Sequence, residues 1–358
     1  AIVPALQDPE MNLGDRAVGD WIVRAHAEGG GPDIHLLQCP ELFGGDEIYS
    51  GEDEHLRFIL LSRAALEMCQ RLDFAPDILH CHDWHTALLP VYLKTLYSWD
   101  RLFLDTKSVL TIHNIGYQGV FGAGIIHDMG LSGSVSELDQ DDLQNDQVNF
   151  LKTGVIHADL LTTVSPTYAR EILEPEYGMG LESQLRRRSE SVIGILNGVD
   201  YGEWSPESDP LIPFPYTAKN LSGKESNKQA LLDEMGLDYQ FDRPLAGIVT
   251  RLTYQKGIDL MQEALPGLLS ERDFSLVVLG SGEDEYEQFF HWLQGEFPDR
   301  VGFFCGFNNQ LAHRIEAGSD LFLMPSRYEP CGLNQMYSLR YGTVPVVRNT
   351  GGLADTVF

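Results

Sequence analysis

The sequence predicts an α/β protein built from two doubly wound domains with parallel sheets, and three observations carry this prediction. The chain has 358 residues, which is more than one compact domain usually needs and fits two. Hydrophobic residues make up 43% and charged residues 22%, the balance of a globular protein with a substantial core. Short β-branched runs followed by amphipathic segments recur along the chain, which is the pattern of parallel βαβ units.

The β-branched runs fall into two sets. In the first set we expect strands at 77–82, 108–113 and 160–164, the last one ahead of a helix that begins near Ser165 and Pro166. The second set follows the run 191–196 and predicts strands at 245–249, 275–279, 301–304, 321–324 and 344–347.

A loop-rich stretch separates the two sets. Residues 197–244 are rich in Pro, Asp, Ser and Asn, so we place the domain change near Gly194 and expect domains over 1–194 and 195–358. A second loop, 130–146, is acidic and rich in Ser and Gly. Doubly wound domains bind ligands at the carboxyl ends of their strands, and every motif discussed below lies at such an end.

Charge and cysteine usage limit the partners and the compartment. The net charge of −28 would repel nucleic acid phosphates, so an anionic substrate must be held by a local group of Arg and Lys. No apolar run approaches the roughly 20 residues that cross a bilayer, and residues 1–30 lack the order of a signal peptide, so we expect no membrane anchor. Five cysteines without a Cys-x-x-Cys pair favour a reducing cytoplasm over a disulfide framework or zinc site.

Both ends of the chain resemble internal segments of a longer sequence. Residue 1 opens directly into the apolar stretch 2–6, and residues 351–358 read as the first turns of a helix. We therefore expect a piece of a longer protein that lacks both termini.

The most informative block is 324–337. Pro330 and Gly332 lie between a buried strand and an apolar-periodic helix, so the N–H groups of Cys331, Gly332 and Leu333 should point into a cleft and attract phosphate. Glu329 would then accept hydrogen bonds from sugar hydroxyls. Taken alone, the block fits equally well a plain strand-to-helix turn with Glu329 as a solvated acid.

The second block is 250–257, between a strand and a helix that carries Ile258, Met261, Leu265 and Leu268 on one face. Arg251 and Lys256 are two cations at a strand end in an acidic protein, as a diphosphate leaving group would need. Lys256 could be an ordinary first-turn residue, but a cation there opposes the helix dipole, which favours a functional role.

The third block is 80–85 together with 113–119. Strand alternation puts His80 and His82 on one face, but no Cys or acid at metal-ligand spacing completes a zinc site. We expect His80 and His85 to be structural. Asp83 and His113 fall at the tips of neighbouring strands, where groups meet substrate.

Two weaker signals point to other functions. Gly280 and Gly282 follow a strand as in a dinucleotide fingerprint, but Glu285 replaces the third glycine, so a nicotinamide site is poorly supported. Asp139 and Asp141 resemble the Asp-x-Asp pair of metal-dependent glycosyltransferases. They follow no strand, and we expect a solvated acidic run there.

Seven segments, in order along nearly the whole chain, resemble the glycogen and starch synthase family of retaining glycosyltransferases. They are His82-Asp83-Trp84-His85, His113-Asn114…Tyr117-Gln118-Gly119, Val164-Ser165-Pro166-Thr167-Tyr168-Ala169, Leu196-Asn197-Gly198-Val199-Asp200, Arg251-Leu252-Thr253…Gln255-Lys256-Gly257, Glu329-Pro330-Cys331-Gly332-Leu333 and Thr350-Gly351-Gly352-Leu353. Each motif alone is weak, whereas seven in register are highly specific.

The resemblance implies a GT-B fold, in which two Rossmann-like domains face each other across a cleft. Residues 1–194 would form the acceptor side and 195–358 the nucleotide-sugar side. The implied donor is ADP-glucose and the implied acceptor is the end of an α-1,4-glucan such as glycogen. No metal or other cofactor is implied.

The family's functional positions carry over to matching residues. Arg251 and Lys256 would grip the diphosphate, Glu329 and His113 would hold the donor glucose, and Asp83 would lie near the acceptor. Further substrate-binding positions implied are Tyr117, Gln118, Asn197, Phe307, Cys331, Gly332, Leu333, Thr350, Gly351 and Gly352. Relatives often carry Tyr against adenine where this chain has Phe307, which keeps the stacking and loses the hydroxyl.

The motifs argue against one mechanism, and the resemblance implies another. Double displacement needs a carboxylate nucleophile paired with a second carboxyl acid, and no such pair presents itself. The resemblance implies same-face attack, in which the departing ADP helps to deprotonate the acceptor hydroxyl. The family's amino-terminal Lys-Thr-Gly-Gly-Leu loop is missing, so we expect this piece to be inactive alone.

Three alternatives stay open at this level. The chain could use UDP-glucose or another acceptor, or be a non-catalytic glucan-binding relative, although Arg251, Lys256 and Glu329 are all retained. A nicotinamide-dependent oxidoreductase is the least favoured.

Overall fold

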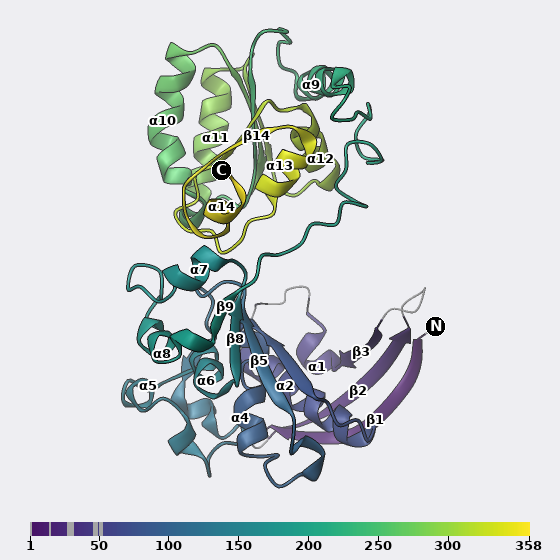
Figure 1. Cartoon of the computed structure of the whole chain (residues 1–358), viewed down its shortest axis with the longest axis vertical. Coiled ribbons are helices and arrows are strands. Elements are labelled where there is room, and N and C mark those ends of the chain that lie inside the picture. The colour runs from purple at the N-terminus through teal and green to yellow at the C-terminus, as the bar shows by residue number, and fades with distance from the viewer. Residues whose placement is uncertain (1, 14–15, 27–31, 46–48, 50–52) are drawn as a thin grey trace. The chain divides into compact units, whose positions relative to one another are not determined.

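The computed structural model describes residues 2–13, 16–26, 32–45, 49 and 53–358 (Figure 1). The chain forms two compact units. The first comprises Ala1–Thr163 and Ile172–Ile193, and the second comprises Val164–Glu171 and Gly194–Phe358. The chain therefore passes between the units after residues 163, 171 and 193. The last crossing lies where the composition changes, whereas the excursion at 164–171 leaves no compositional mark in the sequence.

The first unit is built around a four-stranded sheet of order β4–β5–β8–β9. Its strands are β4 (Ile78–His82), β5 (Lys107–Ile112), β8 (Leu160–Thr163) and β9 (Val192–Gly194). The pairs β4–β5 and β5–β8 are parallel. The three strands predicted in the first set are confirmed, each within one residue at either end.

Helices and short turns precede and connect these strands. They are α1 (Pro40–Phe43), α2 (Glu54–Arg71), α3 (Asp83–Thr86), α4 (Leu89–Lys94), η1 (Arg101–Phe103), η2 (Ala123–Ile126), η3 (Val135–Glu137), α5 (Gln140–Gln144), α6 (Phe150–His157), α8 (Glu182–Arg187) and η4 (Ser189–Ser191), with a small hairpin of β6 (Val120–Gly122) and β7 (Gln147–Asn149). The acidic loop 130–146 thus contains α5. Asp139 caps it by accepting a hydrogen bond from the amide of Asp142 at 3.1 Å, a structural role that the sequence analysis did not assign, whereas Asp141 is exposed as expected.

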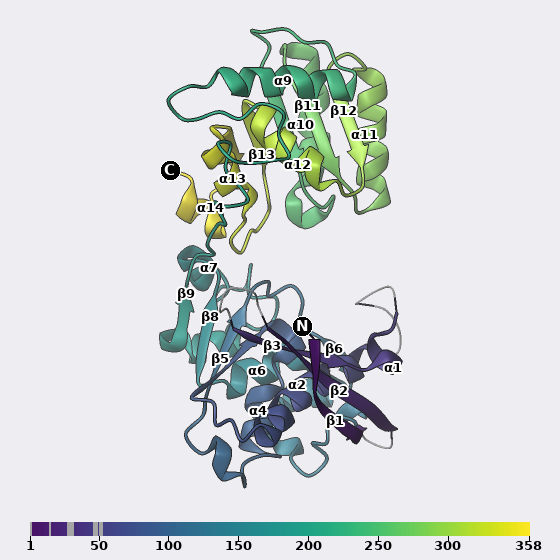
Figure 2. The same cartoon turned by 90° about the vertical axis from the view of Figure 1, so that its right-hand side faces the viewer.

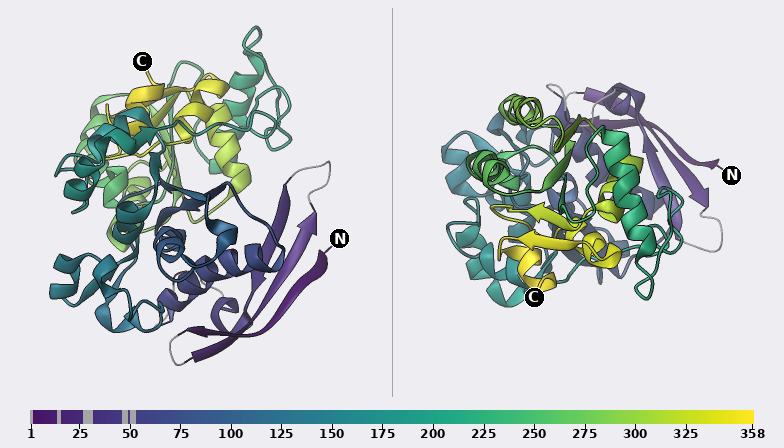
Figure 3. Two further views of the ribbon diagram at one scale, coloured as in Figure 1. Left: turned by 60° about the horizontal axis from the view of Figure 1, so that its bottom comes forward. Right: turned by 90° about the horizontal axis from the view of Figure 1, so that it is seen from above.

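Strands that the sequence did not predict open the chain. β1 (Ile2–Leu13), β2 (Arg16–His26) and β3 (Asp33–Gln38) form a separate antiparallel sheet (Figure 2 and Figure 3). This sheet departs from the all-parallel expectation. Residues 16–26 mix polar and apolar side chains without strict alternation, so the pattern gives no strand signal.

The second unit contains a five-stranded parallel sheet of order β12–β11–β10–β13–β14. Its strands are β10 (Leu245–Val249), β11 (Ser275–Gly280), β12 (Val301–Cys305), β13 (Leu321–Met324) and β14 (Val344–Val347). The five strands predicted in the second set are confirmed. Counted within the unit, their order is 3-2-1-4-5, as in one end of a doubly wound sheet.

Helices cover both faces of this sheet (Figure 1). The helices of the second unit are α7 (Pro166–Glu171), α9 (Ser222–Met235), η5 (Tyr254–Lys256), α10 (Ile258–Glu271), α11 (Asp284–Glu296), α12 (Asn309–Gly318), α13 (Asn334–Tyr341) and α14 (Gly351–Thr356). Along β11, Leu276 and Val278 pack with α10 and α11, whereas Val277 and Leu279 pack with α9 and α12. Burial on both faces explains why this strand reads as a continuous apolar run.

The apolar face of α10 differs by one residue from the prediction. Ile258, Met261 and Leu265 are buried, but Leu268 is 44% exposed and Leu269 is fully buried instead. A step of four residues from Leu265 keeps Leu269 on the buried stripe, because a helix turns once in 3.6 residues. No helix in the described part of the chain is long and apolar enough to cross a membrane.

Candidate functional site

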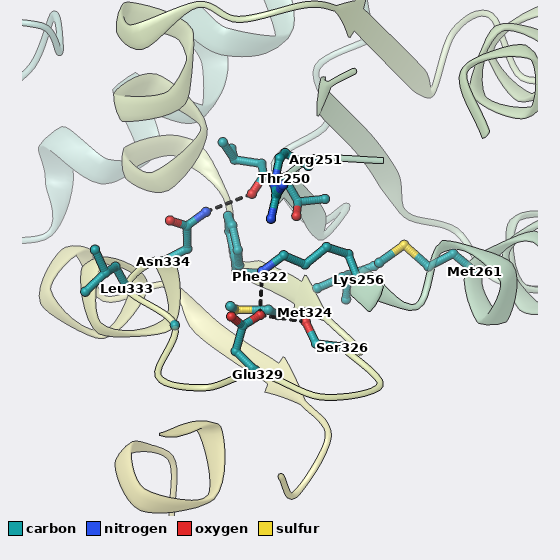
Figure 4. A pocket seen from close by; sticks show the side chains of 13 residues that line it. Thr250, Arg251, Lys256, Met261, Phe322, Met324, Ser326, Glu329, Leu333 and Asn334 are labelled. Carbon is teal, nitrogen blue, oxygen red and sulfur yellow. Dashed lines mark hydrogen bonds and ion pairs between the residues drawn. The ribbon is translucent and has the colours of Figure 1, made fainter. Parts of the chain in front are cut away.

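A cavity of about 350 Å³ opens in the second unit at the carboxyl ends of β10 and β13 (Figure 4). The strand order reverses between these two neighbours, because β11 follows β10 on one side and β14 follows β13 on the other. Connections that leave toward opposite sides create a crevice at this point, where open α/β sheets bind their ligands.

Two loops that are far apart in sequence form the wall of this cavity. The loop after β10 carries Lys256, and its Nζ lies 2.6 Å from Oε2 of Glu329 in the loop after β13. The amide of Arg327 donates to the carbonyl of Gln255 at 2.9 Å. Gly257 has φ +71°, and a Cβ there would lie 2.3 Å from the carbonyl oxygen of Pro325. Only glycine allows the loops to approach this closely.

The charges around the cavity are unusual for this chain. Arg251, Lys256 and Glu329 are the charged residues among those that line it, so the lining is net positive in a chain of net charge −28. The Glu329 side chain is 7% exposed, and its Oε2 also accepts a hydrogen bond from Ser326 Oγ at 3.0 Å. A nearly buried carboxylate needs such partners, because an unpaired buried charge is costly.

The amino-terminal end of α13 also faces the cavity. Gly332, Leu333 and Asn334 line it, and Asn334 donates through Nδ2 to the carbonyl of Val249 at 2.7 Å. Gly332 has φ +74°, so the backbone can turn here from the strand into the helix. Helix amino termini stabilise negative charge, which suits a phosphate group.

Cys331 lies behind this helix tip. Its side chain is buried, and burial raises the pKa of its thiol. The backbone amide of Asn197 donates a hydrogen bond to this thiol, which places Asn197 beside the Glu329 loop.

Thr350, Gly351 and Gly352 support the Glu329 loop and are not among the described residues that line the cavity. The amide of Gly352 donates to the carbonyl of Glu329 at 3.1 Å. Thr350 Oγ1 and the amide of Gly351 both donate to Glu171, which the sequence analysis missed. A lone Glu in a predicted helix gave no signal for this contact.

In the first unit, Asp83 and His113 meet at the ends of β4 and β5. Asp83 Oδ1 accepts hydrogen bonds from the amides of His113 at 2.7 Å and Asn114 at 3.4 Å. Asp83 itself has φ +53°, an uncommon conformation for a residue other than glycine. Asp83 therefore fixes the backbone that carries His113.

His82 is a further partner of His113 that the sequence analysis did not assign. Its Nδ1 lies 2.9 Å from Nε2 of His113, and partial burial, with His80 and His113, lowers its pKa. His80 bonds instead to Thr111 Oγ1 at 2.6 Å. Within the described residues, no three His, Cys, Asp or Glu side chains converge as a metal site.

The remaining predicted residues have different surroundings. Gln118 uses its side-chain amide internally, donating to the carbonyls of Ile115 and Met179 and accepting from Asn149. Tyr117 is half-exposed, and Phe307 is highly exposed after β12.

The two glycines at the end of β11 serve a packing role. A Cβ on Gly280 would lie 2.1 Å from the carbonyl oxygen of Thr250, and the amide of Gly282 donates to Glu287 at 2.8 Å. In a dinucleotide site that amide would face the pyrophosphate. The geometry therefore gives the nicotinamide alternative no support.

The fold and the cavity define the class of protein. A doubly wound sheet with a cationic pocket at its switch point is typical of nucleotide binding. Residues 4–187 match the family model described as starch synthase catalytic domain, and residues 239–357 match the model described as glycosyl transferases group 1. The chain is a glycosyltransferase.

Similar proteins indicate which glycosyltransferases this chain resembles. A glycogen synthase of Anaeromyxobacter dehalogenans strain 2CP-C is 49% identical over 97% of this chain and 73% of its own length. One of Myxococcus xanthus is 51% identical over 91% of this chain and 69% of its own length. One of Thermodesulfovibrio yellowstonii is 45% identical over 91% of this chain, which spans only 66% of that relative.

A solved structure agrees with these relatives. The catalytic domain of starch synthase IV from Arabidopsis thaliana, bound to ADP and acarbose, matches with a TM-score of 0.90 and 37% identity over all of this chain and 74% of that one. The chain belongs to the glycogen and starch synthase family, and the predicted GT-B class with its two α/β domains is confirmed.

Proposed function

We propose that the protein transfers glucose from ADP-glucose to the non-reducing end of an α-1,4-glucan, with retention of configuration. The observation that carries the proposal is the Lys256–Glu329 pair beside Arg251 at the switch point of the second unit. Family membership supports the glucan acceptor, and the ADP in the starch synthase IV structure supports the donor nucleotide. On this reading residues 195–358 bind the nucleotide sugar and residues 1–194 the acceptor, in the cytoplasm.

In this mechanism the cavity stabilises the departing diphosphate. Arg251 and Lys256 supply positive charge, and the tip of α13 at Gly332 and Leu333 adds amide dipoles. Glu329 accepts hydrogen bonds from the donor sugar while Lys256, 2.6 Å from its Oε2, holds the side chain in place. The bond between the anomeric carbon and the ADP oxygen breaks, and the acceptor oxygen bonds to that carbon on the same face. The departing ADP takes the acceptor proton, and the configuration is retained.

Donor competition tests the proposal. We expect a full-length form to extend glycogen with labelled glucose from ADP-glucose, and excess UDP-glucose to compete weakly. The new linkage should be α by proton NMR of a short oligosaccharide product. Equal use of UDP-glucose would contradict the proposed donor, and a β product would contradict retention. Glucan binding without any transfer would instead favour the non-catalytic alternative.

A further inference from the structure

A carboxylate from the amino-terminal half of the chain occupies the start of α14, behind the cavity. Glu171 Oε1 accepts hydrogen bonds from Thr350 Oγ1 at 2.9 Å and from the amide of Gly351 at 3.0 Å, and Oε2 also lies 3.0 Å from that amide. Glu171 ends α7, the short segment that groups with the second unit although its sequence neighbours belong to the first.

The first residues of α14 have no room to move relative to the Glu329 loop. Gly351 has φ +46°, and a Cβ there would lie 1.9 Å from the carbonyl oxygen of Glu329. A Cβ on Gly352 would lie 2.2 Å from the carbonyl oxygen of Cys331. The amide of Gly352 also donates to Glu329 at 3.1 Å. Backbone therefore packs directly on backbone, and a shift of α14 must move the loop.

Glu171 is thus connected to the cavity through a short series of contacts. It accepts from Gly351, the next residue Gly352 donates to the carbonyl of Glu329, and the Glu329 side chain meets Lys256 at 2.6 Å. A second contact fastens the same two helices, because Thr167 donates to Asp355 through its amide at 2.7 Å and its hydroxyl at 2.6 Å. This second contact does not touch Gly351.

We propose that Glu171 is a positioning residue for the transfer reaction, which holds the Glu329 loop in place through the first residues of α14. The inference rests on the proposed function. Thr350 and Gly351 then serve Glu171 rather than the substrate directly. Two donors at the start of α14, the hydroxyl of Thr350 and the amide of Gly351, therefore share one acid drawn from a distant part of the sequence.

The test compares Glu171→Ala with Glu171→Gln and with Asp355→Asn in a full-length form. A misplaced catalytic group costs on the order of a hundredfold, so we expect Glu171→Ala to lower kcat by about ten- to a hundredfold. The KM for ADP-glucose should change less, because Arg251 and Lys256 remain. Glu171→Gln keeps one accepting oxygen and should recover most of the activity. Asp355→Asn, which loosens α7 without touching Gly351, should retain most of its kcat.

A double-mutant cycle separates positioning from general destabilisation. Because Glu171 acts through Glu329, Glu171→Ala should have little further effect on kcat in a Glu329→Ala background. Equal losses in both backgrounds, an unchanged kcat, or an equal loss in Asp355→Asn would overturn the inference. Should Glu171→Ala fail to fold, Thr350→Val removes one of the same hydrogen bonds and must lower kcat. A wild-type protein without transfer from any nucleotide-glucose would refute the proposed function itself.

Discussion

Lys256 and Glu329 show how one ion pair can prepare a site for a charged leaving group. Their side chains are 16% and 7% exposed, so water screens the pair little. The pair gives this nearly buried carboxylate a cationic partner beside the cavity, where an unpaired buried charge would be costly. Because Glu329 balances the charge of Lys256, Arg251 gives the cavity its net positive charge.

Replacing Lys256 by Ala tests this residue. A hydrogen bond to a charged group contributes about 1.5–3 kcal/mol, and about 1.4 kcal/mol corresponds to a factor of ten in rate. We expect Lys256→Ala to lower turnover by roughly ten- to a hundredfold in initial-rate assays on a full-length form. Lys152→Ala is the matched control, since it removes the ion pair to Asp142 at 2.5 Å in the first unit. Unchanged kinetics in Lys256→Ala would remove this residue from the proposed role.

At the scale of elements, the position of α14 depends on two adjacent glycines. Gly351 requires both a left-handed backbone and the absence of a side chain, since the carbonyl of Glu329 fills the place of a Cβ. Gly342, after α13, has φ +71°, but no atom lies within 4 Å of the place that a Cβ would take. A side chain at Gly342 would meet only the strain of a left-handed backbone, whereas one at Gly351 would also clash with the Glu329 carbonyl.

We predict that Gly342→Ala loses roughly 1–2 kcal/mol of stability, the cost of placing a Cβ in the left-handed conformation. Gly351→Ala should lose a further 1–3 kcal/mol, approximately, from overpacking, and should also lower turnover because it displaces Glu329. Urea denaturation and initial rates measure the two effects. Equal losses for both variants would show that the contact with Glu329 does not matter.

At the scale of the whole molecule, the second unit buries a polar network away from the proposed site. Glu316 is almost fully buried on α12, where Ser338 Oγ donates to its Oε2 at 2.7 Å. Tyr341 donates to Asp209, which also contacts His313 Nδ1 at 2.8 Å. Burial raises the pKa of Glu316 to about 8.

This raised pKa predicts the sign of a pH effect on stability. Between the ordinary Glu pKa of about 4.3 and pH 8, the folded protein holds a proton that the unfolded chain has released, so stability falls as pH rises. Glu316→Gln should therefore gain stability over the wild type by up to about 1.4 kcal/mol per pH unit in this window. Urea denaturation of both proteins at pH 5, 6.5 and 8 measures this difference. A constant difference would show that Glu316 is ionised in the folded state.

Much of the fold could be predicted, because the buried strands of the two parallel sheets leave a strong local signal. β10, β13 and β14 have their predicted bounds, and each consists mainly of apolar residues. The antiparallel strands β1–β3 and the helix α5 were missed, since their residues lack such a pattern. The crossing of residues 164–171 into the second unit also leaves no local trace.

The sequence by itself determined the alternation of strands and helices, the family, and the residues Arg251, Lys256 and Glu329, because these depend on local patterns and motifs. Only the tertiary structure decided that Lys256 and Glu329 form a pair, that Asp83 fixes the backbone of His113, and that Glu171 holds Gly351. These contacts join residues 30 to 180 positions apart. Contacts of this kind arise from the order of strands in a sheet and from close backbone packing, which no local pattern of residues specifies.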